Sequence, residues 1–450
     1  MNLDQVWTPT AAYRACLPAW RQVEVLMRGA AALREAGKTY LPKFTYESEA
    51  AWRTRRDRSF LTNYFKKTVT GLTGRAFSRP LVLGEDVPPA LRDWAEDIDL
   101  AGNNLQVFAR QVFLAGLRDG LCHILVDCQS AGQGGARPRP YMVRLEAQAV
   151  IGWRTAVVDG REVLTQLRVR EMVEEPDGPW GGRLVERIRV FEPGRFQLWQ
   201  EGKDGWEVIQ EGALSLPVIP LVTFYANQSG FLTAEPPLMD LADKTIEGWQ
   251  SASDQKNCLT TARFAMLAVT GVAADEFQSE VPVGPNMILK SSQEGARFTY
   301  VEPSGAAIES GERDLARIER EAELMGMAFL LSRPGQVTAT AKAIEESQEM
   351  SGLMSLVLDL GDALEGAFGL LAAWAGLPDG GSLEMNRDFG LLPGAQGDLA
   401  SLCRLFELGA VSRRTLLWEA RRRGVLADDF DPAAEESRLS AEALPPLAGA

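Results

Sequence analysis

The sequence contains one helical pattern that is too long for a helix of an ordinary compact domain. From Ala341 to Gly376, apolar residues recur at three- and four-residue steps, at Leu353, Leu356, Leu360, Leu364, Ala367, Leu371 and Trp374. A helix over 341–376 has about 36 residues and is about 54 Å long at about 1.5 Å per residue. In a chain of 450 residues, this length allows about three packed units or one elongated chain of several segments.

The first half of the chain changes from a helical to an extended pattern. Residues 1 to about 125 are predicted to be mainly helical, with one helix over 19–36 that ends at Gly37. Between about 141 and 210, apolar and polar residues alternate, and turn pairs such as Asp159-Gly160 interrupt the alternation. This region is therefore predicted to be an antiparallel β-meander.

The second half alternates between helical spacing and short extended runs punctuated by proline and glycine. Pro334 and Gly335 must break a helix, because proline lacks an N–H and glycine loosens the backbone. The predicted segments are helices over 236–264 and 306–332, a small α/β module over 265–305, a loop over 333–340, the long helix over 341–376, and shorter helices with a tail over 377–450.

Composition and charge limit the function. The chain is 46% hydrophobic and 24% charged, as in soluble globular proteins, and its net charge is −14 at pH 7. Bulk positive charge, which lets a protein coat nucleic acid, is excluded, so any DNA contact must be local. Five scattered cysteines predict a reducing compartment. Neither a signal peptide nor a membrane anchor is expected.

The chain has a single histidine, His123. Histidine is the usual general base near neutral pH and the commonest metal ligand, so most hydrolase triads and histidine-rich metal sites are excluded. Cys122, His123 and Cys128 invite a metal interpretation, but on one strand they would point to alternate faces. We expect a buried strand there, and we expect no enzyme activity, no catalytic residues, no metal and no cofactor.

Two further patterns resemble catalytic motifs. Gly37-Lys38-Thr39 is similar to the end of a phosphate-binding loop, but Ala32 stands where the first glycine is needed, so a helix end is favoured. Pro176-Asp177 followed by Glu201-Gly202-Lys203 matches the PD…ExK pattern of magnesium-dependent nucleases. Both pieces of that pattern fall in predicted turns, whereas the chemistry needs rigid strands. A nuclease that uses Asp177, Glu201 and Lys203 remains the alternative.

Arginines cluster in two places. One cluster consists of Arg53, Arg55, Arg56 and Arg58, and the other of Arg413, Arg414, Arg421, Arg422 and Arg423. A solvated helix face paired with nearby carboxylates is the simpler explanation. Contact with phosphate or with a partner protein is the alternative, and in the second cluster the arginines are candidate contacts.

The order of these segments, together with short local motifs, resembles the portal proteins of tailed bacteriophages. The resemblance covers nearly the whole chain. The motifs are Tyr40-Leu41-Pro42-Lys43, Arg118-Asp119-Gly120 before HILVD, Arg139-Pro140-Tyr141, Ile151-Gly152-Trp153-Arg154, Pro236-Pro237-Leu238 with Asp240-Leu241-Ala242, Val269-Thr270-Gly271, Thr338-Ala339-Thr340-Ala341 and Asn386-Arg387-Asp388-Phe389.

The resemblance implies an elongated α+β portal fold. Its parts would be a wing over 1–235, stem helices over 236–264 and 306–332, a clip over 265–305, a tunnel loop over 333–340, a spine helix over 341–376, and a crown with a tail over 377–450. A plain turn between two helices is the alternative for the tunnel loop. The residues expected to face DNA are Arg333, Pro334, Gly335, Gln336, Val337, Thr338, Thr340 and Lys342.

The resemblance also implies a function and partners. Such proteins form a dodecameric ring at one capsid vertex, through which double-stranded DNA is packaged and ejected. The large terminase subunit, a head–tail adaptor, the major capsid protein and a scaffold would be partners, and the protein would be assembled in the host cytoplasm and reside in the virion. An acidic channel would repel phosphates and let DNA slide. A helical scaffold protein of unknown partner is a further alternative.

Overall fold

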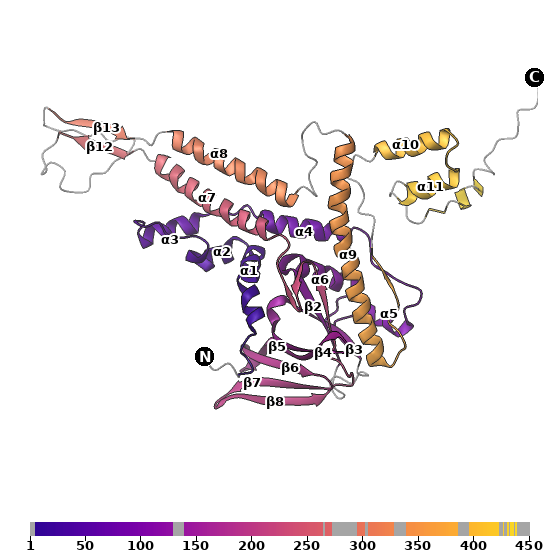
Figure 1. Cartoon of the computed structure of the whole chain (residues 1–450). Helices are drawn as coiled ribbons and strands as arrows, with labels where there is room; N and C mark the ends of the chain where they lie inside the picture. The colour runs from indigo at the N-terminus through magenta and orange to yellow at the C-terminus, as the bar shows by residue number, and fades with distance from the viewer. Residues whose placement is uncertain are drawn as a thin grey trace, which may run out of the picture. The chain divides into compact units, whose positions relative to one another are not determined.

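The computed structural model describes residues 5–128, 139–263, 266–271, 295–301, 305–327, 339–385 and 396–422, together with short pieces between 426 and 438. It is a mixed α+β protein with several antiparallel sheets (Figure 1). Its contacts divide the chain into two units, Met1–Asn386 and Arg387–Ala450, which are described separately.

The N-terminal part is helical, as predicted. Its helices are α1 (Ala11–Arg28), α2 (Ala30–Ala36), α3 (Glu49–Arg58), α4 (Tyr64–Ala76), α5 (Pro89–Ala95) and α6 (Leu105–Asp119). Thr10, Ser48, Asn63 and Asn104 cap four of them by accepting a backbone N–H. The single helix predicted over 19–36 is wrong: it is interrupted at Gly29, whose φ of 89° no helical residue adopts.

The predicted meander is a five-stranded antiparallel sheet in sequential order. Its strands are β4 (Val150–Val158), β5 (Arg161–Asp177), β6 (Gly181–Glu192), β7 (Arg195–Gly202) and β8 (Gly205–Ala213). The turn at Asp159-Gly160 is where the sequence placed it, another turn lies at Pro193-Gly194, and both glycines have positive φ. The meander begins later than predicted, because Tyr141 lies in β3 (Pro140–Leu145) and that strand belongs to another sheet.

That other sheet has three antiparallel strands in the order β3, β2 (Leu121–Cys128) and β9 (Leu221–Tyr225). On one face Phe224 stacks on Phe113 of α6, with ring centroids 5.8 Å apart, and Val222 lies against Gly366 of α9. On the other face Leu125 shares a core with Leu167 of the meander. Both faces of β2 are therefore buried, which explains its largely apolar sequence.

Helix α9 (Ala339–Ala375) confirms the long helix predicted from periodicity. In its described C-terminal part the predicted stripe is largely buried, at Leu353, Leu360, Leu364, Ala367 and Leu371. Gly380 is packed so closely on α9 that a Cβ there would lie 2.5 Å from the Phe368 backbone. The backbone therefore crosses the helix beside Gly369, one of the glycines within the long pattern.

Short pairs complete this unit. They are β1 (Val82–Leu83) with β14 (Leu383–Glu384), β10 (Gln228–Gly230) with β11 (Thr233–Ala234), and β12 (Met266–Thr270) with β13 (Arg297–Val301). The last pair agrees with the small module predicted over 265–305, and the run NMILK at 286–290 lies outside the described residues. The second unit contains α10 (Gln396–Glu407) and α11 (Arg413–Arg422), the shorter helices predicted after 377.

Candidate functional site

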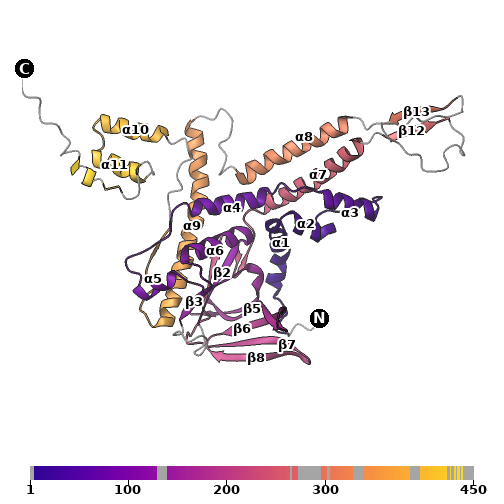
Figure 2. The ribbon, with the colours of Figure 1, turned by 180° about the vertical axis from the view of Figure 1, so that it is seen from behind.

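Helices α7 (Met239–Arg263) and α8 (Gly305–Ala322) lie side by side in an antiparallel pair, and β12 and β13 follow at one end (Figure 1; from behind in Figure 2). Both helices were predicted. Glycines let them approach closely, because a Cβ on Gly248 would lie 3.3 Å from Ile318 and one on Gly311 would overlap the Gln255 side chain. Ile318 is buried in this contact. The pair is therefore closely packed rather than loosely juxtaposed.

The end of α8 differs from the predicted stripe. The regular helix ends at Ala322 and continues as a π-helical turn over Glu323–Met327. A π-turn adds a residue and rotates the following side chains. Consequently Gly326 lies against Leu241, whereas Met325, which lies seven residues after Ile318 and would share its face on a regular helix, is 47% exposed.

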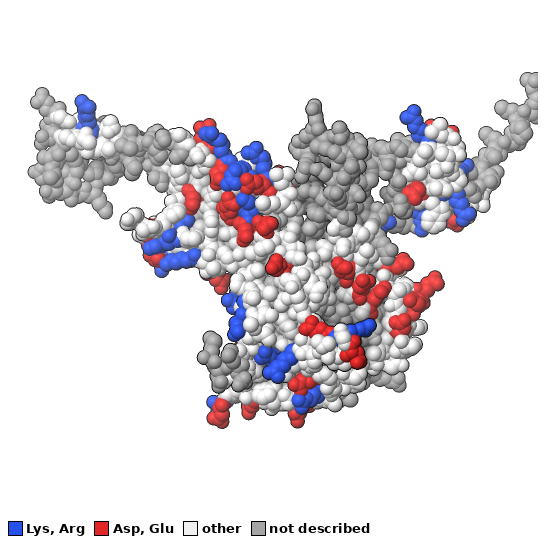
Figure 3. Space-filling view, in the orientation of Figure 1, with Lys and Arg blue, Asp and Glu red and all other residues white. Residues whose placement is uncertain are grey.

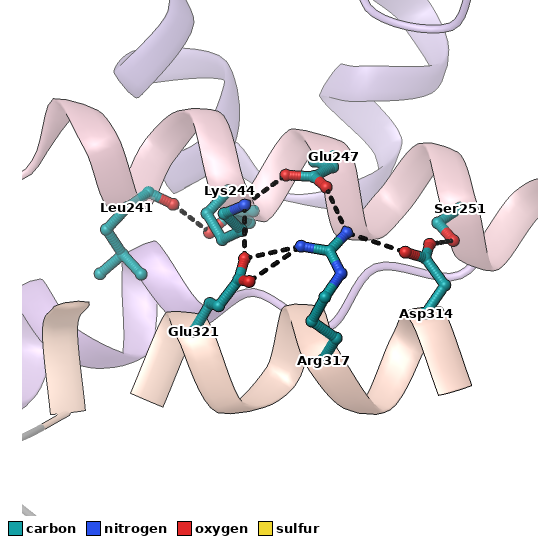
Figure 4. A network of polar contacts seen from close by, with 8 residues as sticks. Leu241, Lys244, Glu247, Ser251, Asp314, Arg317 and Glu321 are labelled. Carbon is teal, nitrogen blue, oxygen red and sulfur yellow. Dashed lines mark hydrogen bonds and ion pairs between the residues drawn. The ribbon is translucent and has the colours of Figure 1, made fainter. Parts of the chain in front are cut away.

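Polar contacts join α7 to α8 along one side of the seam (Figure 4). Lys244 of α7 donates hydrogen bonds to Glu247, at 2.6 Å, and across the seam to Glu321, at 2.8 Å. The Lys244 ammonium thus lies between one carboxylate of its own helix and one of the partner helix. Glu247 and Glu321 raise the pKa of Lys244, so this group stays charged.

Arg317 of α8 occupies the centre of the network (Figure 4). Its guanidinium lies 2.9 Å from Glu321, 2.8 Å from Asp314 and 3.1 Å from Glu247 on α7. Asp314 in turn accepts a hydrogen bond from Ser251 of α7 at 2.7 Å. Arg317 lowers the pKa of Asp314, and Lys244 and then Arg317 lower that of Glu321. Both carboxylates are therefore ionised at neutral pH.

The network holds α7 and α8 in one register. Each of its cations contacts carboxylates on both helices, so a shift of one helix along the other would break contacts at several points. The sequence contains a signal for half of it, because the three- and four-residue spacing of Asp314, Arg317 and Glu321 places opposite charges on one helix face. The pairing across the two helices could not be predicted, since periodicity does not give their register.

The first arginine cluster is partly a structural anchor. Arg53 and Arg56 are on the surface, and their carboxylate partners are Glu49 and Asp57, as the simpler explanation predicted. Arg55 differs, because its side chain is 2% exposed and contacts Glu47, Asp254 of α7 and the Pro42 carbonyl. The interpretation of Arg55 as part of a solvated face is therefore wrong.

His123 and Cys122 are buried in β2. The imidazole Nδ1 of His123 lies 2.8 Å from the Thr223 hydroxyl, and burial lowers the pKa of His123 to about 3. The Cys122 thiol donates to the Leu145 carbonyl, and burial raises its pKa to about 12. In the described part of the chain, no three of the His, Cys, Asp and Glu side chains are placed to hold a metal ion. The buried strand is thus the interpretation that these contacts support.

Gly37-Lys38-Thr39 forms a 3-10 turn at the C-terminal end of α2. The Lys38 ammonium lies 3.1 Å from Glu49 and 5.3 Å from the centroid of the Trp52 ring. A phosphate-binding loop needs the N-terminus of a helix, where backbone N–H groups are free. The motif therefore marks a helix end, as the sequence analysis favoured.

The nuclease residues are not brought together. Asp177 pairs with Gly181 at the tip of the β5–β6 hairpin, whereas β7, which carries Glu201, pairs with β6 from Arg187 onward. Gly181 and Arg187 are about 20 Å apart along β6, at about 3.3 Å per residue. Lys203 lies in the turn between β7 and β8. A shared magnesium site on Asp177 and Glu201 is incompatible with this register.

The predicted DNA-facing residues lie mostly outside the described residues. Arg333, Pro334, Gly335, Gln336, Val337 and Thr338 precede α9, and Thr340 and Lys342 lie in its first turn, where the side chains are not described. In the second unit, Arg413 and Arg414 are exposed at the start of α11, and Arg421 lies over Trp418. Arg422 ends that helix, and Arg423 lies outside the described part.

Comparison with known proteins gives the following matches. Residues 237–375, which include α7, α8 and α9, match a family described as a domain of unknown function, DUF4055. The chain is similar, at 14% identity and a TM-score of 0.46, to a chain from the neck of an empty gene transfer agent particle computed with C6 symmetry, covering 85% of this chain and 96% of that one. No curated protein matches.

Two further solved structures are similar. A chain from the virion of a native gene transfer agent particle has 15% identity and a TM-score of 0.44, covering 88% of this chain and 98% of that one. A chain from the neck of a native particle, computed with C12 symmetry, has 14% identity and a TM-score of 0.40, covering 78% and 87%. Among the helices that the structure describes, none combines the length and apolar content that crossing a membrane needs.

Proposed function

We propose that the chain is a portal subunit of a tailed-phage-like particle. Identical copies, twelve by the sequence resemblance, would form a ring at one capsid vertex and conduct double-stranded DNA during packaging and ejection. The chain would have no catalytic residues and no cofactor. The large terminase subunit, a head–tail adaptor, the major capsid protein and a scaffold are its proposed partners, and the virion, after assembly in the host cytoplasm, is its proposed location.

The observation that carries this proposal is the antiparallel pair of α7 and α8, which is followed by the long helix α9. A helix pair with a small β element between its helices, followed by a long helix, is the order that the resemblance implies for stem, clip, stem and spine. The β12–β13 pair is marginal alone, since a two-stranded sheet buries little apolar surface. Leu324 and Met325 are 56% and 47% exposed at the end of α8. Neighbouring copies in a ring would cover such surfaces.

The charges of the helix pair support a passive channel. Lys244 and Arg317, the cations of the network, are each in contact with carboxylates. They are therefore poorly available to phosphates, and the whole chain is acidic, with a net charge of −14. Weak attraction for the DNA backbone lets a duplex move along a channel without being captured.

The proposal is tested by imaging the purified full-length protein in negative stain, together with its mass in solution by light scattering. Rings with a central hole wide enough for a duplex, and a mass that is a multiple of the subunit mass, are the expected result. A chain that remains monomeric at all concentrations would overturn the proposal. Magnesium-dependent DNA cleavage that is lost on Glu201→Ala would also overturn it, in favour of the nuclease.

A further inference from the structure

A loop over residues 40–48, here called the aromatic loop, places large side chains in solvent. Tyr46 is fully exposed, and Phe44 is 50% exposed. Exposed single hydrophobic residues are common on protein surfaces and need no explanation by themselves. This loop differs because hydrogen bonds from α3 and α7 hold its backbone in place.

The aromatic loop is fixed through its backbone. The Tyr40 carbonyl accepts a hydrogen bond from Gln250 of α7 at 2.6 Å, the Leu41 carbonyl accepts one from the Trp52 indole at 2.9 Å, and the Pro42 carbonyl accepts one from Arg55 at 2.8 Å. A loop that is ordered before binding loses less conformational entropy when a partner arrives. Exposed tyrosine is also enriched at protein interfaces. The loop therefore has the properties of a preorganised contact.

The surroundings of the loop are basic, and the other side of the helix pair is acidic. Over residues 38–58, here called the α3 platform, Lys and Arg outnumber Asp and Glu by six to three, and by five to two without the buried pair of Arg55 and Glu47. Over 305–323, which contain α8, Asp and Glu outnumber Lys and Arg by six to three. Figure 3 shows the blue groups over α3, and blue and red groups interleaved over α7 and α8. By these counts the α3 platform has a net positive charge and α8 a net negative charge.

The α3 platform and α8 lie on opposite sides of α7, in both Figure 1 and Figure 2. Two complementary surfaces on opposite sides of one subunit cannot meet within a copy. They can meet between copies arranged head to tail, which is the kind of interface that closes a ring.

The two surfaces also lie at the same level along α7. The platform contacts α7 at Gln250 and Asp254. On the other side, Gln255 donates to the Ile308 carbonyl and Ser251 to Asp314, so this level of α8 is residues 308–314. Between those contacts, Glu312 is exposed and the Glu309 side chain is 69% exposed.

We propose that the α3 platform of one copy binds α8 of the next copy, around Glu309 and Glu312. In the proposed ring, α7 and α8 run along the ring axis. Rotation about that axis does not change the position of a residue along it, so the platform of one copy lies at the level of residues 308–314 of its neighbour. Arg53 and Arg58 supply positive charge, and Tyr46 supplies contact area. This inference rests on the proposed function, because it assigns an interface of the same ring.

Two charge-reversal variants test the pairing. One carries Arg53→Glu with Arg58→Glu, and the other Glu309→Arg with Glu312→Arg; all four positions are exposed. In each variant alone, like charges face each other at every interface, so we expect at least about a tenfold lower fraction of subunits in rings at equal concentration. Light scattering and negative-stain imaging measure that fraction.

Mixing the two variants in equal amounts gives the decisive result. In a ring that alternates them, every interface again joins opposite charges, so rings should return and contain both variants in equal numbers. A folding defect would not be repaired by mixing. Rings that form normally in both single variants, or a mixture that stays dissociated, would overturn the inference.

Tyr46→Ser tests the apolar part, with Trp180→Ser as its control. Trp180 is 97% exposed at the tip of the β5–β6 hairpin, away from the platform. We expect Tyr46→Ser to lower the ring fraction and Trp180→Ser to leave it unchanged, and equal effects would contradict the assignment. A monomeric wild-type protein overturns the proposed function as well. Wild-type rings with unaffected variants overturn this interface alone.

Discussion

The Arg55 guanidinium of α3 lies 3.0 Å from the carboxylate of Asp254 on α7, although 199 positions separate them in the sequence. The same guanidinium makes two hydrogen bonds of 2.9 Å to Glu47. It therefore joins the aromatic loop, α3 and α7 through one side chain.

Arg55→Ala should lower the free energy of unfolding by about 3 kcal/mol, because it leaves Glu47 with 7% exposure and no cation. Arg53→Ala is the matched control on the same helix. Its side chain is 66% exposed and 4.0 Å from Glu49, so a change below about 0.5 kcal/mol is expected. Urea unfolding of the dissociated subunit, in which Arg53 makes no contact with another copy, measures both. Equal losses in the two variants would show that Arg55 is not an anchor.

The network between α7 and α8 should weaken in acid. The folded-state pKa values of Asp314 and Glu321 are lowered by Arg317 and Lys244, so their stabilisation is present above the unfolded-state pKa values, near 4, and is lost as the pH falls further. Hydrogen exchange of α8 amides at pH 6 and pH 3 measures this. With Asp314→Asn and Glu321→Gln together, protection at pH 6 should already be low. Unchanged protection in that variant would contradict the prediction.

His123 should make the protein less stable in mild acid. Its pKa is about 3 in the folded protein and about 6.5 when unfolded, so below pH 6.5 the unfolded state takes up a proton that the folded state does not. The free energy of unfolding should therefore fall by about 2 kcal/mol between pH 7 and pH 5 through this residue. His123→Gln should remove that part of the pH dependence in urea unfolding. If the free energy of unfolding had the same pH dependence in the wild type and in His123→Gln, the prediction would be wrong.

Gly120 is required where α6 turns into β2. Its φ is 91°, and a Cβ there would lie 2.3 Å from the Glu235 carbonyl oxygen. Gly120→Ala should cost about 3 kcal/mol, from left-handed backbone strain plus a clash with backbone that cannot easily move. Gly102→Ala is the control, with a similar φ of 85° and no neighbour within 4 Å, so about 1 kcal/mol is expected. Thermal unfolding measures the loss of stability in both variants. Similar losses would show that the clash with the Glu235 carbonyl does not contribute.

Deletion of Gln336, Val337 and Thr338 tests the predicted tunnel loop. If these residues face DNA in the proposed ring, rings should form as in the wild type, while packaging or retention of DNA declines. Electron microscopy of the rings and a nuclease-protection assay of packaged DNA measure the two effects. Particles that package and hold DNA normally would show that the segment is a plain turn between helices.

Much of the fold follows from local patterns in the sequence. The stripe of α9 and the alternation of β4 to β8 repeat over many residues, so period alone indicates each element. Pairing between distant segments leaves no such signal. Tyr141 has the same alternation as the meander, but it lies in β3, which pairs with β2 and contributes Leu145 to the core that contains Leu125. The break at Gly29 was missed because the apolar spacing continues on both sides of it.

The candidate site was predicted less completely for the same reason. The helices α7 and α8 were predicted, and Thr245 and Trp249, four residues apart on α7, are buried. The contacts of Lys244 and Arg317 depend on how the two helices are aligned, which sequence period does not specify. Arg55 was assigned to the surface because its neighbours are charged, but its position on α3 faces Asp254 of a distant segment.

The network in the helix pair determines which movements are available to β12 and β13. A slide of α8 by one turn would move Arg317 about 5.4 Å and separate it from Glu247. Sliding would therefore break contacts between the helices, whereas tilting both helices together keeps them. A force on β12 and β13 would accordingly move α7 and α8 as one rigid body. The motion would be transmitted to the opposite end of the pair, where Gly326 is packed between Leu241 of α7 and Thr68 of α4.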